Sequence, residues 1–337
     1  MKITSSFLLK KRENGVYYIG YYTAGKLHWK TTKCRRKDDA LSFFKNFSAD
    51  VFVPERSLLL SELMKELEIS KRLRTGTVKG YAIAVKLLIR QCGDKPLTEY
   101  QLNDLESFKQ YQLTRKLSDI TVNTWIISLV AVFGYAVKRQ YLKQNPFSLS
   151  VRLKVSKKPP LFITQEEFEK LLKKVQTETL RDFYTVAGNT GMRLSELLNL
   201  KWSSVSFDKK QIGVVNTEDF TTKSGKSRIV PMNELVVTVL SKRFANKNGS
   251  EYVFHKSNGF KYDKNFISHR FKKYVRAAGL NDKYHFHTLR HSFASWLALK
   301  EVPIFSIQQL LGHASVNTTL QYAHLSSSVL HSAVNKI

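Results

Sequence analysis

Apolar side chains recur at helical spacing through most of the chain. Residues 57–153 contain three such stripes, and residues three and four apart share one face of a helix. The pattern predicts four or five helices around a common core, ended by Asn145-Pro146 and followed by a stiff basic linker over residues 156–160. The expected core residues are Tyr81, Val85, Leu88 and Ile89, then Leu102, Leu105 and Phe108, and then Val122, Trp125, Ile126, Leu129 and Phe133.

The first 50 residues follow a different pattern. Aromatic and β-branched residues dominate positions 16–22 and 26–32, and Thr23-Ala24-Gly25 between them is typical of a hairpin turn. Residues 37–47 have helical spacing with acidic residues in the first turn. The pattern predicts a separate basic module, in which a small three-stranded sheet packs against one helix.

A third segment begins near residue 161. Thr164 and Glu167 form a capping box before an apolar helical stripe, and residues 211–232 have the pattern of a β-hairpin with Ser224-Gly225 at its turn. A later helix is expected to bury Leu289, Phe293, Trp296 and Leu297. We therefore expect a mostly α fold with small β elements, of the α+β class, in three domains that span residues 1–50, 57–153 and 161–337.

The charge balance indicates the kind of partner. The chain of 337 residues has 55 Lys and Arg against 27 Asp and Glu, a net charge of +28. Such a surface favours a polyanion, and nucleic acid fits best because each neutralised phosphate releases counterions. The alternatives are a basic protein from a proteome with a basic bias, and an RNA- or ribosome-associated protein.

The remaining composition argues for a soluble, cytoplasmic protein. Cys34 and Cys92 are too few for a disulfide framework and do not have metal-ligand spacing. Residues 1–10 contain an apolar run of only three, which is too short for a signal peptide. The longest apolar stretch, residues 124–137, is shorter than a bilayer span and predicts a buried helix. We expect no membrane association.

Side chains suited to phosphate chemistry follow one another in the second half of the chain. Two arginines can hold a phosphate through forked hydrogen bonds, two histidines can move protons near neutral pH, and a tyrosine can attack phosphorus. These residues are Arg193, His287, Arg290, His313 and Tyr322. The set predicts cleavage or transfer of a phosphodiester.

The order of these motifs resembles the tyrosine recombinase, or phage integrase, family. The matching motifs are Thr190-Gly-Met-Arg193-Leu-Ser-Glu196, the lysine hairpin Thr222-Lys223-Ser-Gly-Lys226-Ser-Arg228-Ile-Val-Pro231, His287-Thr-Leu-Arg290, Leu311-Gly-His313, and Tyr322 nine residues further on. The resemblance covers the chain from about residue 164 to the end. It implies a site-specific recombinase or integrase that cleaves and rejoins DNA through a 3′-phosphotyrosine, without ATP, a metal or another cofactor.

The resemblance implies a role for each residue of the set. Tyr322 is the expected nucleophile, Arg193 and Arg290 the expected ligands of the non-bridging oxygens, and His313 a hydrogen-bonding partner of the phosphate. Lys223 is expected to protonate the leaving 5′ oxygen, with Lys226 as its competitor on the same turn. His287 is expected to act as acid or base towards the tyrosine. Supporting roles fall to Glu196, which is suited to orient a basic side chain, and to His291.

The resemblance also implies partners. The first 50 residues resemble the arm-type DNA-binding domain of phage integrases, although a protein-interaction module is an alternative, and the helical segment resembles a SAM-like core-binding domain. Double-stranded DNA at attachment sites, a homotetramer in the synapse, a monomer or weak oligomer when free, and an excisionase or DNA-bending accessory protein are expected. An apolar tail over residues 325–337 is expected to dock on a neighbouring protomer. Candidate DNA contacts, which could equally be a solvated charged face, are Lys71, Arg72, Arg74, Lys79, Lys86, Lys226 and Arg228.

Three other functions compete with the recombinase. A zinc site could use His285, His287, His291 and His313, but no carboxylate or cysteine joins the set and Arg290 would repel a dication. A type IB topoisomerase would share the chemistry, and the basic N-terminal module and short tail favour the recombinase instead. A catalytically silent DNA-binding regulator would have lost an arginine or the tyrosine, and none is lost.

Overall fold

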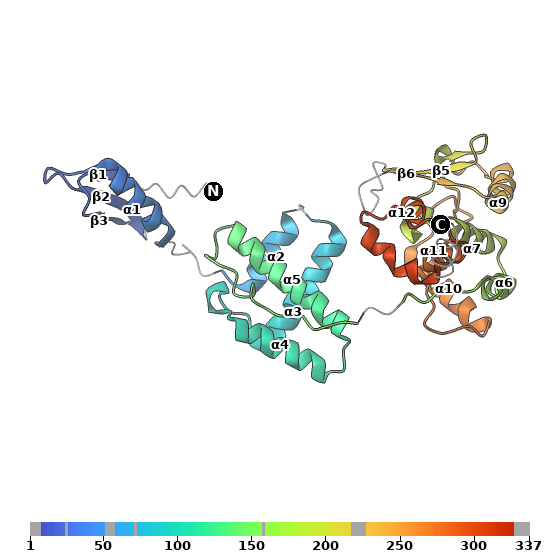
Figure 1. The fold of residues 1–337 in the computed structure, drawn as a ribbon, viewed down its shortest axis with the longest axis horizontal. Helices are drawn as coiled ribbons and strands as arrows, with labels where there is room; N and C mark the ends of the chain where they lie inside the picture. Colours follow the sequence, from blue (N-terminus) through green and yellow to red (C-terminus); the bar gives the residue numbers. More distant parts are fainter. Residues whose placement is uncertain are drawn as a thin grey trace, which may run out of the picture. The chain divides into compact units, whose positions relative to one another are not determined.

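The computed structural model describes residues 8–23, 26–50, 58–70, 73–156, 159–216 and 227–326. The chain divides into two compact units, residues 1–156 and residues 157–337 (Figure 1). The described residues are mostly helical with two small antiparallel sheets, which confirms the expected α+β class. The division of the first unit at about residue 50 stays a prediction.

The first unit begins with the expected sheet and helix. Strands β1 (Leu8–Lys11), β2 (Tyr17–Thr23) and β3 (Lys26–Thr31) pair antiparallel in that order, and α1 (Lys37–Asp50) follows. Ile19 of β2 and Ala40 of α1 are fully buried. Gly20 of β2 lies under Trp29, where an added Cβ would stand 2.9 Å from the indole ring, so a larger residue would displace this aromatic side chain. The predicted turn at residues 24–25 lies outside the described residues.

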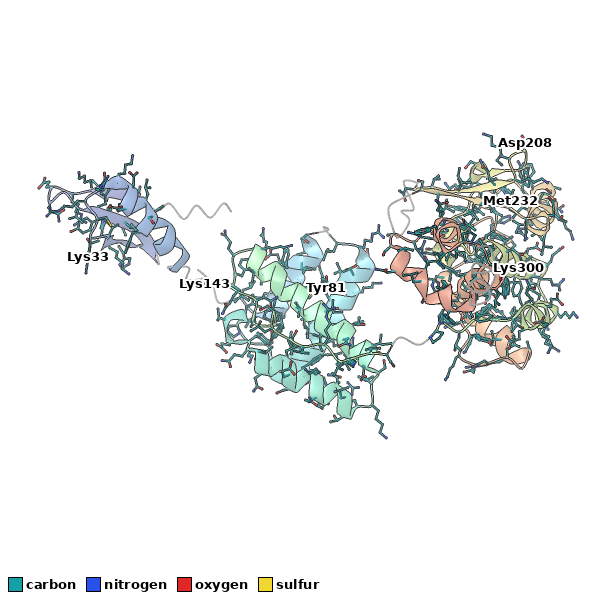
Figure 2. The ribbon with its side chains drawn as sticks, viewed as in Figure 1. Lys33, Tyr81, Lys143, Asp208, Met232 and Lys300 are labelled. Atoms are coloured by element: carbon teal, nitrogen blue, oxygen red, sulfur yellow. The ribbon has the colours of Figure 1, made fainter. Side chains whose placement is uncertain are left out.

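A helical bundle forms the rest of the first unit. It consists of α2 (Leu60–Ile69), α3 (Thr75–Cys92), the 3₁₀ turn η1 (Leu97–Glu99), α4 (Leu102–Thr114) and α5 (Asp119–Lys138). The apolar stripes expected from the sequence meet in one core, in which Leu88, Phe108 and Phe133 are fully buried and Tyr81 is partly buried (Figure 2). By length and composition α5 could cross a membrane. Its stripe of buried residues, from Val122 to Ala136, instead packs into this core.

The second unit contains seven α-helices among its described residues, and a three-stranded sheet. In chain order the elements are α6 (Gln165–Lys174), α7 (Glu178–Thr190), α8 (Leu194–Leu198), η2 (Trp202–Ser204), β4 (Val205–Ser206), β5 (Gln211–Val214), β6 (Arg228–Pro231), α9 (Glu234–Ala245), α10 (Lys264–Ala277), α11 (Thr288–Leu299), α12 (Ile304–Leu311), η3 (Val316–Thr318) and η4 (Leu320–Ser326). The predicted hairpin is present, with Ile212 of β5 opposite Val230 of β6. Met232, directly after β6, is almost fully buried (Figure 2).

Aromatic rings fill the centre of the second unit. Phe183 and Tyr184 of α7 contact Phe254, Phe271 and Phe286 in four ring pairs, of which two are edge to face and two are tilted. Such rings contribute large buried areas and well-defined geometry. Helix α7 therefore forms a rigid central element, and it also packs against α11 and α9.

Two glycines end helices where candidate site residues begin. Gly191 ends α7 with a φ of +61°, and an added Cβ would lie 2.4 Å from the Phe293 ring of α11. Gly312 ends α12 with a φ of +63°, and an added Cβ would lie 2.7 Å from Arg228 Cδ. Both positions combine a left-handed backbone with close packing, which only glycine tolerates. They turn the chain directly before Arg193 and His313.

Candidate active site

Arg193 lies at the start of helix α8, and Glu196, one turn further on, binds it. The backbone N–H of Arg193 donates to Glu196 Oε2 at 2.8 Å, and its Nη1 donates to Oε1 at 2.9 Å. Glu196 has a side-chain exposure of only 1%. Because the backbone and the guanidinium of Arg193 bind the same carboxylate, the arginine is anchored at both ends.

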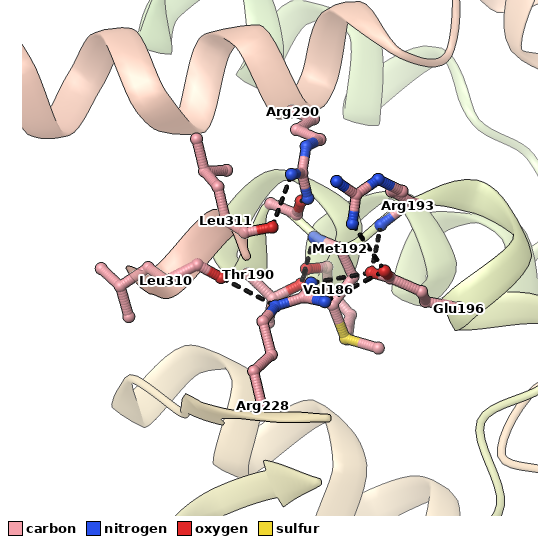
Figure 3. A network of polar contacts seen from close by, with 10 residues as sticks. Val186, Thr190, Met192, Arg193, Glu196, Arg228, Arg290, Leu310 and Leu311 are labelled. Atoms are coloured by element: carbon pink, nitrogen blue, oxygen red, sulfur yellow. Dashed lines mark hydrogen bonds and ion pairs between the residues drawn. The ribbon is translucent and has the colours of Figure 1, made fainter. Parts of the chain in front are cut away.

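A second arginine reaches the same carboxylate from the hairpin. Arg228 of β6 donates to Glu196 through Nη1 at 3.0 Å and Nη2 at 2.7 Å, and its Nε donates to the Leu310 carbonyl of α12 at 3.0 Å (Figure 3). Burial alone would raise the pKa of Glu196, but the hydrogen bonds and charges of Arg228 and Arg193 outweigh it and lower that pKa to about 2. The carboxylate therefore stays ionised between two cations.

This arrangement gives Arg228, a candidate DNA contact, partners within the protein. All three of its guanidinium nitrogens donate within the protein, and its side-chain exposure is 10%. The sequence shows a basic residue on a hairpin, but it does not show the buried carboxylate 32 residues away that binds it.

Arg290 lies on α11 and is 3% exposed. Its Nη1 donates to the Gly191 carbonyl at 2.8 Å and its Nη2 to the Leu311 carbonyl at 2.5 Å (Figure 3). Burial and the charge of Arg193 lower the pKa of Arg290 to about 9, so the group stays cationic at neutral pH. A guanidinium has five N–H donors, and the two carbonyls orient it while leaving donors for an anion.

The histidines approach these arginines from two directions. His287 precedes α11, and His291 lies one turn further along that helix with its ring 5.0 Å from the His287 ring. His313 follows Gly312, and its Nδ1 lies 2.9 Å from Thr319 Oγ1. Burial lowers the pKa of His313 to about 4, and the charges of Arg290 and Arg193 add to this shift. The imidazole of His313 is therefore neutral at pH 7 and lies within the field of both cations.

His287 differs from the other two histidines in its surroundings. The residue is exposed to solvent as a whole. Packing around its ring, together with the charges of His291 and Arg290, lowers its pKa. It is therefore a neutral group that solvent can reach.

Tyr322 lies on η4 and is 1% exposed. Its ring packs in a small core with alanines of α11 and with Ile307 and Leu311 of α12. Its hydroxyl lies 2.7 Å from His291 Nδ1. Burial raises the pKa of Tyr322 to about 12, although the charge of Arg290 opposes this shift. The phenol is therefore neutral at pH 7 and needs a proton acceptor before it can act as a nucleophile.

The structure brings together seven of the predicted catalytic and supporting residues, namely Arg193, Glu196, His287, Arg290, His291, His313 and Tyr322, and it places Arg228, a candidate DNA contact, beside them. Lys223 and Lys226 lie outside the described residues, as do Lys71, Arg72 and the tail from residue 327. Arg74, Lys79 and Lys86 are exposed at the start and along α3 of the first unit. Sequence reasoning missed Thr319 and the carbonyls of Gly191 and Leu311, because nothing in their local sequence indicates a polar partner far along the chain.

The described residues contain no group of three or more His, Cys, Asp or Glu side chains arranged to hold a metal ion. The rings of His285 and His287 are 6.5 Å apart. Two cationic guanidinium groups, neutral imidazoles and a phenol make up the cluster instead. Such a set can neutralise an oxyanion, transfer protons and form a covalent bond to phosphorus.

Two family models match the chain. One, described as the phage integrase family, matches residues 161–328, and the other, described as the phage integrase SAM-like domain, matches residues 57–155. A tyrosine recombinase from Thermosipho africanus is 28% identical over 276 residues, which cover 79% of this chain and 95% of the relative. Tyrosine recombinase XerC from Pediococcus pentosaceus is 27% identical over 297 residues, which cover 82% and 97%.

Solved structures share the fold. An integrase of the Tn1549 transposon, in complex with transposon right end DNA, has a TM-score of 0.70 at 20% identity and covers 82% of this chain and 100% of its own. A lambda integrase dimer bound to a core site has a TM-score of 0.65 at 20% identity and covers 96% of each chain. Both family models, the recombinases matched over nearly their full length and the cluster of arginines, histidines and tyrosine agree. The chain therefore belongs to the phage integrase family and is a tyrosine site-specific recombinase.

Proposed function

We propose that this recombinase integrates or excises a DNA element by cleaving and rejoining strands at attachment sites through Tyr322. The observation that carries the proposal is the gathering of the Tyr322 hydroxyl with Arg290, Arg193 and His313 at the ends of three helices of the second unit. The tyrosine oxygen attacks the scissile phosphate, the bond to the 5′ oxygen breaks, and a 3′-phosphotyrosine forms. A 5′ hydroxyl from another strand then reverses the reaction, so ATP is not needed.

The two arginines neutralise the phosphate in this proposal. Arg290 is fixed by two backbone carbonyls and Arg193 by Glu196, so both guanidinium groups are oriented before substrate arrives. Preorganised donors of this kind usually supply the largest share of catalysis, because they do not reorganise as charge develops. His313 donates a hydrogen bond to the phosphate, and a histidine of the His287–His291 pair serves as an acid or base towards the tyrosine. Lys223 gives its proton to the leaving 5′ oxygen.

The proposed partner is double-stranded DNA. The integrases of known structure include a lambda integrase dimer on a core site and a tetramer on a Holliday junction. We propose a homotetramer for the synapse, a monomer or weak oligomer in its absence, and an excisionase or DNA-bending protein as accessory factor.

Lys79 and Lys86 are seven residues apart on α3, so both lie on one exposed helical face suited to phosphates, with Arg74 at the start of the helix and Lys71 and Arg72 before it. Lys226 is proposed as a further contact. The site of action is the cytoplasm.

Replacing the nucleophile tests the proposal. Tyr322→Phe keeps the ring in its small core but removes the reacting oxygen, so duplex binding should persist while cleavage stops. We expect an SDS-stable adduct on a nicked suicide substrate with the unaltered protein, in magnesium and in excess EDTA, and none with the variant. An adduct formed by Tyr322→Phe would contradict the assignment. Loss of all cleavage in EDTA would contradict the metal-free chemistry.

A further inference from the structure

We infer that His291 is the residue that accepts the phenol proton of Tyr322 as the tyrosine attacks the phosphate. The inference rests on the proposed function, because it concerns the same reaction. It differs from the expectation drawn from the family resemblance, which gave the acid or base role to His287. The hydrogen bond of 2.7 Å between Tyr322 Oη and His291 Nδ1 carries it.

The geometry of helix α11 separates the two histidines. His287 and His291 are four residues apart and so lie on one face of the helix, one turn from each other. His291 is the member of the pair next to η4, with its ring 6.0 Å from the Tyr322 ring. The His287 ring meets the His291 ring edge to face at 5.0 Å, and His287 as a whole residue is exposed to solvent. The order along this face is therefore Tyr322, then His291, then His287.

The surroundings keep His291 ready to accept a proton. The titratable and charged groups that face it are His285, His287 and Arg290 of its own segment, Tyr322 of η4 and His313 beyond α12. Apart from the tyrosine these groups are cations or neutral imidazoles, and none is a carboxylate. Burial, together with the charges of His285 and Arg290, lowers the pKa of His291 to about 4. The imidazole is therefore neutral at pH 7, and its Nδ1 can accept from the phenol.

The acidities also indicate when the proton moves. With pKa values of about 12 for Tyr322 and about 4 for His291, no phenolate accumulates before substrate binds. The phenol becomes acidic only as its oxygen bonds to phosphorus, and the bound phosphate raises the basicity of the imidazole at the same time. Proton transfer therefore accompanies the attack.

Cleavage exchanges one phosphate ester bond for another, and each proton that moves has a donor and an acceptor. The Oη–P bond forms and the P–O5′ bond breaks, while the phenol proton passes to His291 Nδ1 and Lys223 supplies a proton to O5′. On rejoining, the 5′ oxygen attacks phosphorus as its hydroxyl proton passes to Lys223, the Oη–P bond breaks, and His291 returns its proton to the departing tyrosine oxygen. One histidine thus serves as base in cleavage and as acid in ligation.

The test compares adduct formation by His291→Ala, His291→Gln and His287→Ala, each in the full chain. Single-turnover rates on a nicked suicide substrate are measured from pH 6 to 9.5 with saturating enzyme, so that DNA binding does not enter. We expect His291→Ala to form adduct on the order of 10²-fold or more slowly at pH 7. Its rate should rise about tenfold per pH unit, because solvent must then remove the proton. Added imidazole should restore part of the rate.

The glutamine variant separates proton transfer from positioning. Its amide can hold the Tyr322 hydroxyl by a hydrogen bond but cannot take up a proton, so we expect it to be as slow as the alanine variant and to show the same pH dependence. Wild-type rates in His291→Gln would show that His291 only positions the tyrosine and would overturn the inference. This result is decisive even where the alanine variant does not fold. Unchanged or faster cleavage in His291→Ala, with the steep pH dependence appearing in His287→Ala, would assign the proton to His287. An adduct with Tyr322→Phe would instead refute the proposed function itself.

Discussion

Burial keeps several site residues neutral at pH 7, and this has a consequence for stability. The pKa values of His291 and His313 are lowered from 6.5 to about 4 in the folded protein, chiefly by burial. In the unfolded chain both histidines would take up protons at about pH 6.5. Between pH 6.5 and pH 4 the unfolded state therefore binds more protons, and the folded state loses stability as the pH falls.

We expect the free energy of unfolding of the DNA-free protein to decrease by about 1 kcal/mol for each of these two histidines between pH 7.5 and pH 5.5. Glu196 contributes little in this interval, because the pKa of this carboxyl is lowered from 4.5 to about 2 and its effect begins below pH 4.5. Urea unfolding at the two pH values measures the difference. His313→Gln should reduce the pH dependence, with His269→Gln on an exposed turn of α10 as the control. An unchanged dependence in His313→Gln would mean that this histidine is not held neutral.

A second prediction at this scale concerns Lys223 as the general acid. A substrate with sulfur in place of the bridging 5′ oxygen has a good leaving group, so it does not need that proton. Lys223→Ala should therefore cleave the ordinary substrate slowly and the sulfur substrate at nearly the normal rate. Lys226→Ala is the matched control, three residues further along the chain. If the sulfur rescued Lys226→Ala instead, the role would move three residues along the chain.

At the scale of elements, the bridge through Glu196 joins three parts of the second unit. Arg228 extends from β6 of the hairpin, the carboxylate belongs to α8, and the Leu310 carbonyl belongs to α12. Strand β6 of the hairpin is thereby tied to the helix that precedes His313. Breaking this bridge leaves a buried carboxylate with one cation instead of two, which costs far more than the loss of an exposed ion pair.

We expect Arg228→Met to lower the free energy of unfolding of the catalytic unit by about 3 kcal/mol. Lys242→Met is the matched control, because Lys242 pairs with Glu178 on the exposed surface and its loss should change stability little. Arg228→Lys should recover little, since an ammonium cannot form the forked contact with Glu196 and also reach Leu310. Urea unfolding of the three variants tests this. Equal stabilities for Arg228→Met and Lys242→Met would show that the bridge contributes nothing.

At the scale of the whole molecule, the net charge of +28 is spread over several parts of the chain. The N-terminal sheet and helix contribute several lysines and arginines, while the described cations of the active site are enclosed among other side chains. Phosphate contacts made by separate parts add to the salt dependence of binding, because each releases counterions. The contribution of one part can therefore be measured by removing it.

Deleting residues 1–50 should weaken binding to DNA that carries distal arm sites and flatten its dependence on salt. Covalent adduct formation at a core site should persist, because Arg193, Arg290 and Tyr322 remain. Binding isotherms between low and physiological salt, with core-only DNA as the control, give the comparison. An unchanged salt slope on arm-site DNA would favour a protein-interaction role for this module.

Local sequence was sufficient for the elements and for the family. The apolar stripe with Leu88 and the one with Phe133 predicted the bundle, and the alternation around residues 211–232 predicted the hairpin, because helical and strand periodicities depend only on near neighbours. The ordered motifs from Arg193 to Tyr322 indicated the chemistry for a similar reason. Each motif is a short local pattern.

Only the tertiary structure decided which side chains meet. Arg228, a candidate DNA contact, binds Glu196 32 residues away, and the Arg290 guanidinium is oriented by a carbonyl 99 residues away. His291, expected to play a supporting part, is the histidine that contacts the Tyr322 hydroxyl. These contacts depend on how α7, α8, α11, α12 and the hairpin pack together, and no periodicity within one element records the distance to another.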